Sequence, residues 1–443
     1  MLLRGIILPK PTSIEGPNGN GWRAQIVALL FIVALINYFD RQSLSVIAPL
    51  MQAQLHISDR GYGHVVSLFL FASAIAYALA GFLSDRLGAG RAMAIFVAWW
   101  SLAEASTAFA SSLATLCMAR FCLGLGEPGL WVAAPKAIGE SFPKKQRGLA
   151  IGICTLGATL GAVVALPIIA VMSRHLAWRF IFLFDGLAGL LWLPLWLWWY
   201  PLRPAKPESI KATDCHSIEN RNTRDSMPSS LHSVLARAAT WKLLLARSIT
   251  DPVWYFYLFW FPKYLLTARH LTLAHIAHIG WMVYLGAGAG TLAGGLATGI
   301  LISRGMRAPN AYRWTMLGAA TLIPLSPFVA WASSDLLAVA FASIIAFAHM
   351  AWLVTLTATV VELYPSAQVG KALGLIAAGS GFGGMLSSEI IGYLVVHGGY
   401  TPVFLIMAIL HPVAIVLLWS TFARKPAPQT VVGESYQPLP SAT

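Results

Sequence analysis

The chain has 443 residues, of which 57% are hydrophobic and only 11% are charged. Soluble proteins carry roughly 25% charged residues, so this composition excludes a soluble globular protein and indicates an integral membrane protein. The formal net charge is +13, and the four cysteines form no CxxC pair or Cys/His cluster. Neither a disulfide framework nor a metal site is therefore expected.

Twelve apolar stretches of about 20 residues follow an N-terminal segment, residues 1–23, whose apolar run is too short and broken for a signal peptide. The predicted centres are Leu35, Phe71, Ser101, Gly124, Leu160, Leu190, Trp254, Gly288, Ile323, Ala348, Gly381 and Met407. Six spans form an N-terminal half, residues 24–200, and six form a C-terminal half, residues 243–424. A polar linker, residues 201–242, separates the halves, and residues 425–443 are expected to be a disordered tail.

Lys and Arg residues divide unevenly between the two sides of the membrane. If the N-terminus is inside, the inner segments hold 23 of these residues and the outer loops hold five. Positive residues accumulate on the cytoplasmic side, so we expect both termini in the cytoplasm, in a bacterial inner membrane or a plasma membrane. The net positive charge is then mainly a feature of the cytoplasmic surface, so no nucleic-acid partner is needed to explain it. We expect a monomer surrounded by lipid.

The first span contains two charges, in the stretch INYFDRQSLSV. Asp40 and Arg41 lie deep in the span, where a charge costs ~2.5–3.5 kcal/mol and usually marks a pathway. In the fourth span, Arg120 and Glu127 are seven residues apart, which places both on one helix face ~10.5 Å apart. Arginine binds a substrate carboxylate, and a released carboxylate takes up a proton, so this set could couple anion to proton movement. Two salt bridges that only fix helix register are the alternative.

An internal repeat joins the two halves. ESFPKKQRGLAIGICTLGATLG, residues 140–161, recurs as ELYPSAQVGKALGLIAAGSGFG, residues 362–383, at a constant offset of 222. This offset covers six spans, so both copies cross the membrane in the same direction. The repeat predicts an all-α fold of two six-helix halves related by a pseudo-two-fold axis along the membrane normal. Its glycines suit close helix packing.

The loop after the second span reads GFLSDRLGAGR, residues 81–91. It resembles the G-x-L-x-D-R-x-G-x-x-R loop of the major facilitator superfamily, in which the loop locks the cytoplasmic gate and the aspartate bridges the halves. The resemblance implies gating roles for Asp85, Arg86 and Arg91; the alternative is a set of solvated loop charges. The corresponding loop of the second half, GGLATGILISRG, has no Asp-Arg pair, so any gate charge bridge is one-sided.

Residues 24–424 also resemble the anion:cation symporter branch of that superfamily, in particular its hexuronate transporters. The similar pieces are NYFDR (37–41), RFCLGLGEPG (120–129), FPKKQRGLAIGI (142–153) and TDPVWYFYLFWFPKYL (250–265). The resemblance implies carboxylate ligands at Arg41 and Arg120, protonatable couplers at Asp40 and Glu127, and a pocket wall that includes Tyr38 and aromatic residues of the seventh span. The predicted substrate-binding set also includes Trp131, Tyr257 and Ser380.

Three amides of the branch pattern are replaced, at Leu130, Thr155 and the pair Ser380–Gly381. A sugar acid needs many hydrogen-bond partners, so a substrate with fewer hydroxyls than a hexuronate is expected. The roles of Glu104, His349 and Glu389 inside spans stay open between function and structure. Asp185 and Asp251 are expected nearer the span ends and more easily hydrated.

The sequence therefore predicts a secondary transporter, not an enzyme, with protons as the coupling ion and no cofactor. The expected substrate is a small organic anion: a hexuronate, an aldonate or a related carboxylate. An exporter of drugs or metabolites with the same fold is the alternative. A membrane enzyme or sensor is disfavoured because no nucleotide loop, metal cluster or long soluble domain is found in the sequence.

Overall fold

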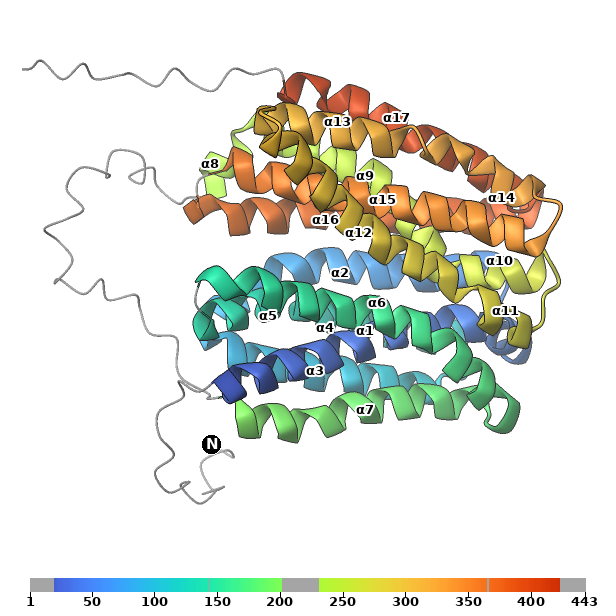
Figure 1. The fold of residues 1–443 in the computed structure, drawn as a ribbon. Helices are drawn as coiled ribbons and strands as arrows, with labels where there is room; N and C mark the ends of the chain where they lie inside the picture. The colour runs from blue at the N-terminus through green and yellow to red at the C-terminus, as the bar shows by residue number, and fades with distance from the viewer. Residues whose placement is uncertain (1–19, 143, 201–230, 365, 423–443) are drawn as a thin grey trace, which may run out of the picture.

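A computed structural model describes residues 20–142, 144–200, 231–364 and 366–422, and all regular secondary structure within them is helical. This confirms the predicted all-α class. Residues 1–19 and most of the predicted linker and tail lie outside the described residues. Figure 1 shows the helices running roughly side by side across the molecule, with those of the first half below those of the second.

The N-terminal half contains seven α-helices and one short 3₁₀ helix. They are α1 (Asn20–Leu55), α2 (Asp59–Leu87), α3 (Ala89–Ser106), η1 (Thr107–Phe109), α4 (Leu113–Gly126), α5 (Pro128–Ser141), α6 (Lys144–His175) and α7 (Trp178–Trp199). The C-terminal half contains α8 (Leu231–Leu235), α9 (Ala238–Phe259), α10 (Phe261–Thr267), α11 (Leu273–Ile279), α12 (Trp281–Ser303), α13 (Ala308–Ala320), η3 (Ile323–Leu325), α14 (Pro327–Trp331), α15 (Asp335–Leu363), α16 (Ser366–Gly398) and α17 (Thr401–Phe422).

Two of the twelve predicted spans are each divided into two helices and are not counted among the segments long and apolar enough to cross a membrane. Within the described part of the chain, nine helical segments are long and apolar enough to cross a membrane, and the bent α2 makes a tenth. The other two spans are α4 with α5 and α9 with α10, which break at Glu127 and Trp260. Pro128 explains the first break, because proline supplies no N–H for a helical hydrogen bond.

The predicted repeat is visible in helix packing. Helices α6 and α16 begin at Lys144 and Ser366, 222 residues apart. Four repeat glycines lie so close to a neighbouring helix that an added Cβ would clash with its backbone. The pairs are Gly157 with Phe31, Gly161 with Leu35, Gly379 with Leu244, and Gly383 with Ser248. Helix α6 therefore packs on α1 in the same register in which α16 packs on α9.

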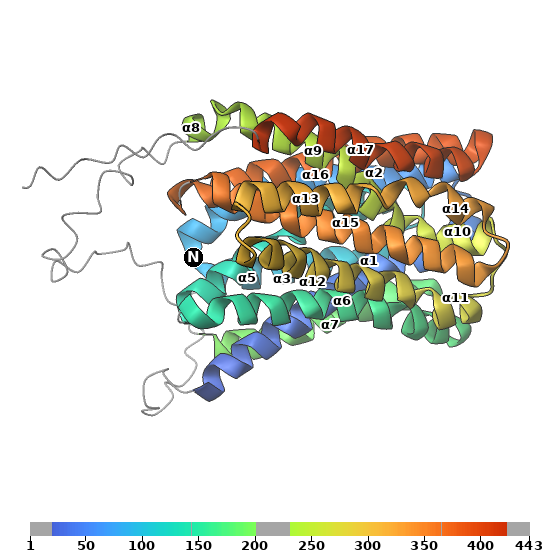
Figure 2. The same ribbon diagram turned by 45° about the horizontal axis from the view of Figure 1, so that its top comes forward.

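The halves meet through α2 against α16 and α6 against α12. Figures 1 and 2 both place α2 beside the second half. We call the side where α1 begins and α17 ends the terminal face, and the other side the opposite face. Five polar contacts between the halves lie on the opposite-face side of Arg41: Gln42–Tyr284, Ser45–Phe259, Asp59–Lys263, Tyr62–Phe259 and His64–Glu389.

Packing is looser toward the terminal face. An added Cβ at Gly139, Gly152, Gly370 or Gly374 would meet nothing within 4 Å. Near the opposite face, by contrast, a Cβ at Gly63 of α2 would clash with the backbone of α16 at Ser388. The halves are therefore closed against each other at the opposite face, whereas these four glycines on the terminal-face side have open space beside them among the described residues.

Candidate substrate and coupling site

Arg41 lies between the halves and is held by one carboxylate. Its Nε donates to Glu127 Oε2 at 2.6 Å, and Glu127 is fully buried. The guanidinium carbon lies 5.3 Å from the ring centre of Tyr38 and 5.6 Å from that of Phe69, on α2. Aromatic faces stabilise a cation in a desolvated position, so Arg41 keeps its charge here. Tyr38 in turn packs edge-on against Trp131, with the ring centres 5.9 Å apart.

Arg120 has different partners from those of Arg41. Its Nη1 lies 3.0 Å from Glu104 Oε2, within ion-pair distance but without hydrogen-bond alignment. Its Nη2 donates to Thr107 Oγ1 at 3.0 Å, and Phe182 lies beneath the guanidinium. Although Arg120 and Glu127 belong to the same span, each pairs with a different helix. Arg120 is only 1% exposed, so the N-terminal half encloses it.

Asp40 turns away from the Arg41–Glu127 pair. Neither of its carboxylate oxygens has a hydrogen-bond partner, and the residue is fully buried. It meets Glu104 of α3 and Asp185 of α7, and one carboxylate oxygen from each of the three lies within 4.8 Å of the others. The expectation that Asp185 is easily hydrated is wrong: it is 5% exposed, because α7 directs it at α1, where it accepts a hydrogen bond from Ser43.

The C-terminal half contributes Ser380, a predicted site residue, and two polar groups that the sequence reasoning did not single out, Tyr255 and Arg247. Tyr255 and Ser380 share a hydrogen bond of 2.8 Å between α9 and α16. Arg247, expected in the polar segment before the seventh span, lies inside α9 and donates to Asp251 at 2.9 Å. That pairing keeps Asp251 buried, against the expectation that it is hydrated. The four-residue spacing of Arg247 and Asp251 was the available signal.

Tyr257 lies apart from this group. It is fully buried, and its ring packs against Phe256 and Phe261 within the aromatic core of the second half. The hydroxyl of Tyr264, a second candidate donor on the same face, donates to the Val329 carbonyl at 3.1 Å. Ser380 therefore has Tyr255, rather than Tyr257, as its neighbour.

The residues left open have structural partners. His349 Nδ1 and His411 Nε2 are 3.2 Å apart in the core of the second half, and Trp254 stacks on His349. Glu389 Oε2 lies 2.6 Å from His64 Nδ1, which joins α16 to α2. Glu104 belongs to the buried carboxylate cluster described above.

The motif loop joins α2 to α3 at the terminal face. Gly88 has a φ of 82°, a conformation that glycine adopts without strain and that permits the tight turn. Asp85 Oδ1 accepts from Lys136 Nζ at 2.6 Å, and Lys136 belongs to the same half. In this conformation Asp85 therefore does not bridge the halves through that contact. Arg86 and Arg91 are exposed.

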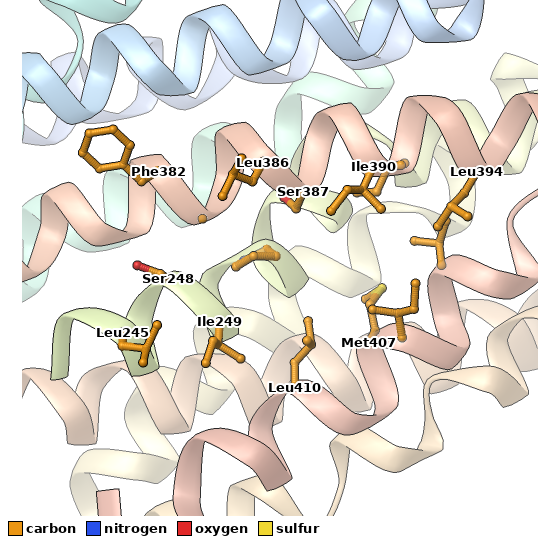
Figure 3. Close-up of a pocket in the computed structure, with 15 residues that line it drawn as sticks. Leu245, Ser248, Ile249, Phe382, Leu386, Ser387, Ile390, Leu394, Met407 and Leu410 are labelled. Atoms are coloured by element: carbon orange, nitrogen blue, oxygen red, sulfur yellow. The ribbon is translucent and has the colours of Figure 1, made fainter. Parts of the chain in front are cut away.

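An apolar groove of about 440 Å³ lies elsewhere, between α9, α16 and α17 (Figure 3). Its walls include Phe382, Leu386 and Ile390, which are 45–59% exposed, and its polar side chains are the hydroxyls of Ser248 and Ser387. A groove without a charged residue does not suit an organic anion. Exposed apolar side chains on membrane-spanning helices suit contact with lipid.

Sequence comparison connects this arrangement to known proteins. The profile of the Major Facilitator Superfamily matches residues 30–361 and 277–441. The hexuronate transporter of Escherichia coli K12 is 24% identical over 434 residues, covering 95% of this chain and 98% of the relative. A probable sulfoacetate transporter of Cupriavidus necator is 28% identical over 393 residues, covering 85% of this chain and 88% of the relative.

Solved structures have the same fold. A D-xylose-proton symporter superposes with a TM-score of 0.68 at 15% identity, covering 90% of this chain and 97% of its own. An inward-facing bacterial homologue of the lysosomal transporter Spinster gives 0.66 at 18% identity, covering 91% and 96%. The twelve-helix prediction and the transporter prediction are thereby confirmed. The chain belongs to the Major Facilitator Superfamily, as a multi-pass membrane transporter rather than an enzyme.

Proposed function

We propose that this protein transports a small organic anion, with Arg41 as the ligand of its carboxylate. The observation that carries the proposal is the Arg41–Glu127 pair between the two halves, at 2.6 Å. A substrate carboxylate can replace Glu127 on the guanidinium and form the bidentate contact that arginine favours. Relatives named for hexuronate, D-galactonate and sulfoacetate transport support this substrate class, because all three compounds are organic anions.

The second half completes the site. Tyr255 and Ser380 supply hydroxyls, and Arg247 supplies a second positive charge across from Arg41. Arg120, with Glu104 and Thr107 as partners, balances charge inside the first half. Leu130 is fully buried in the apolar core, where the relatives' pattern has an amide, so few groups bind sugar hydroxyls. We therefore favour an anion with few hydroxyls over a hexuronate.

Proton coupling follows from the same exchange. When a substrate occupies Arg41, Glu127 loses its ion-pair partner inside a buried environment, where an unpaired carboxylate is costly. Glu127 then takes up a proton, and substrate and proton cross together. Release of the substrate returns Arg41 to Glu127 and expels the proton. Symport of one anion with a proton on Glu127 is the resulting mechanism.

Alternating access uses the two ends of the interface between the halves. Contacts such as Asp59–Lys263 close the opposite face, which we assign to the outside, and the open terminal face is cytoplasmic, as the distribution of Lys and Arg predicts. Closing the terminal face brings the loop of Asp85, Arg86 and Arg91 to the second half, where Asp85 leaves Lys136. We place the protein as a monomer in a bacterial inner membrane or a plasma membrane.

Purified protein in proteoliposomes tests this function. With an inward proton gradient, a panel of hexuronates, aldonates, aromatic acids and sulfonated acids is screened for accumulation and for accompanying alkalinisation outside. Accumulation of at least one small acid, inhibited by unlabelled acids and not by the matching neutral sugars, is expected. Transport of neutral or cationic compounds in preference to every acid would contradict the proposal and favour an exporter.

A further inference from the structure

Three carboxylates lie together inside the first half, outside the Arg41–Glu127 pair. Asp40, Glu104 and Asp185 come from α1, α3 and α7, which the sequence separates by 64 and 81 residues. Each presents one oxygen, and these oxygens all lie within 4.8 Å of one another. The residues are at most 5% exposed. This spacing suits three oxygen ligands around one small cation.

The charges within this cluster do not balance. Arg120 is the ion-pair partner of Glu104, at 3.0 Å, and Arg41 is taken by Glu127. Arg120 acts electrostatically on all three carboxylates, so among these interactions of the described residues one positive charge faces three acidic groups. A buried, unpaired carboxylate is strongly unfavourable, so the cluster has to be neutralised by protons, by a bound cation, or by both.

Two further observations point to a bound ligand. Among the described residues, neither carboxylate oxygen of Asp40 has a hydrogen-bond partner, although Asp40 is fully buried. Ser43, one helical turn from Asp40, donates its hydroxyl to Asp185 Oδ2 at 2.5 Å, which leaves the hydroxyl oxygen as a fourth possible ligand. All four are hard oxygen donors, which bind alkali and alkaline-earth cations rather than soft metals.

We propose that Asp40, Glu104 and Asp185, with Ser43, form a Na⁺-binding site in the core of the first half. Mg²⁺ retains several waters, and side chains this buried leave little room for them. Ca²⁺ takes roughly six to eight oxygen ligands, whereas these four side chains offer one oxygen each. A monovalent cation meets the smaller ligand number, and together with Arg120 and a proton on one carboxylate it balances the charge of the cluster. The site goes beyond the proposed function, because the proton on Glu127 does not require it.

Na⁺ binding is tested on the purified full chain without substrate. The melting temperature is followed while NaCl replaces choline chloride at constant ionic strength and constant pH. A ligand that binds only the folded state raises stability in a saturable way. We expect a saturable rise with Na⁺ that KCl does not reproduce, and matching saturable binding of radioactive ²²Na⁺ to the immobilised protein.

Asp185→Asn keeps the size of the side chain and an acceptor for Ser43, and it should abolish both the Na⁺-dependent rise and ²²Na⁺ binding. Asp251→Asn, at a buried carboxylate of the second half, should keep both. If Asp185→Asn does not fold, Ser43→Ala takes its place, with a right-shifted Na⁺ titration expected. Glu127→Gln should respond to Na⁺ like the parent protein, which separates this site from the proton mechanism.

Several results would overturn the proposal. One is an equal response to Na⁺ and K⁺, and another is an undiminished Na⁺ response in Asp185→Asn. A melting temperature that responds to pH or to divalent cations but not to Na⁺ would also contradict it. The carboxylates would then bind protons or another metal.

Discussion

The two halves share their helix packing but differ in their interiors. Phe31 of α1 and Leu244 of α9 meet equivalent glycines, and in that register Arg41 corresponds to Trp254. Where the first half holds a buried cation and its carboxylates, the second has Trp254 stacked on His349. In the proposed mechanism, the duplicated scaffold therefore carries its charge exchange in the first half, while the second half supplies aromatic rings, hydroxyls and the Arg247–Asp251 pair.

The difference between the two halves bears on how they move against each other. The groups that bind charge need fixed partners, and the first half provides them through ion pairs between its own helices, such as Arg41–Glu127 and Arg120–Glu104. The second half can then move against the first without breaking those pairs. Substitutions in the first half should change binding and coupling strongly, whereas those in the second should change affinity modestly.

The largest effect is expected from Arg41→Ala. Removing a buried cation from a charge pair costs ~2–5 kcal/mol, so substrate affinity should fall by about 30-fold or more. Lysine should restore little, since it lacks the planar fork. Isothermal titration with a transported acid measures this. Arg247→Ala, the matched change in the second half, should weaken binding less, and a larger effect there would reverse the assignment of the two halves.

Replacing a closely packed glycine by alanine should lower the stability of the protein equally in both halves. Gly157→Ala and Gly383→Ala each force a Cβ against a neighbouring backbone, so each should lower stability by about 1–3 kcal/mol. Gly152→Ala, with open space around its Cβ, should be neutral or stabilising because alanine favours the helix. Thermal unfolding in detergent compares the three. Equal melting temperatures for Gly157→Ala and Gly152→Ala would contradict the shared register.

The contact between Lys263 and Asp59 should set how often the opposite face opens. Lys263→Met removes the ion pair and keeps the packing of the stem, so the open population should rise by about five-fold, from a loss near 1 kcal/mol. Spin labels at exposed positions of the two halves, Ala53 and Ala268, report the distance by electron paramagnetic resonance. An unchanged distance distribution would show that this pair does not hold the face closed.

The smallest effect is expected from Tyr255→Phe. Loss of one hydroxyl that bonds Ser380 should weaken substrate binding by up to about tenfold. Tyr257→Phe is the control, because its hydroxyl is buried among aromatic rings. Competition of labelled substrate with unlabelled acid compares the two. A larger effect at Tyr257 would favour the site expected from sequence over the one seen between α9 and α16.

Hydropathy and the repeat predicted the helices well because both depend on local sequence. All twelve predicted centres fall on described helices or on η3, and the 222-residue offset reappears in the starts of α6 and α16. Side-chain partners across helices were harder to predict. Spacing placed Arg120 and Glu127 on one helix face. It could not indicate that Arg120 pairs with Glu104 and that Glu127 pairs with Arg41.

Charges near span ends caused the other errors. The division of Lys and Arg between the two sides counted Arg247 with the inner segments and Lys263 with the outer loops. Both lie in helices, and Lys263 is 1% exposed. The attraction between paired charges offsets part of the cost of burying them. Hydropathy does not count that partner, so it ends a span too early there. Asp185 was also wrongly expected to be hydrated. Its hydrogen-bond partner, Ser43, lies 142 residues away in the sequence, so local hydropathy could not indicate the contact.

Exchange of Arg41 between Glu127 and the substrate is tested most directly by Glu127→Gln in proteoliposomes. Two rates are compared: counterflow with substrate on both sides, and accumulation driven by a pH gradient. The variant cannot release a proton, so counterflow should persist while accumulation is lost. Accumulation at the rate of the parent protein would contradict the coupling role of Glu127, and a parallel loss of both activities would show that the ion pair is only structural.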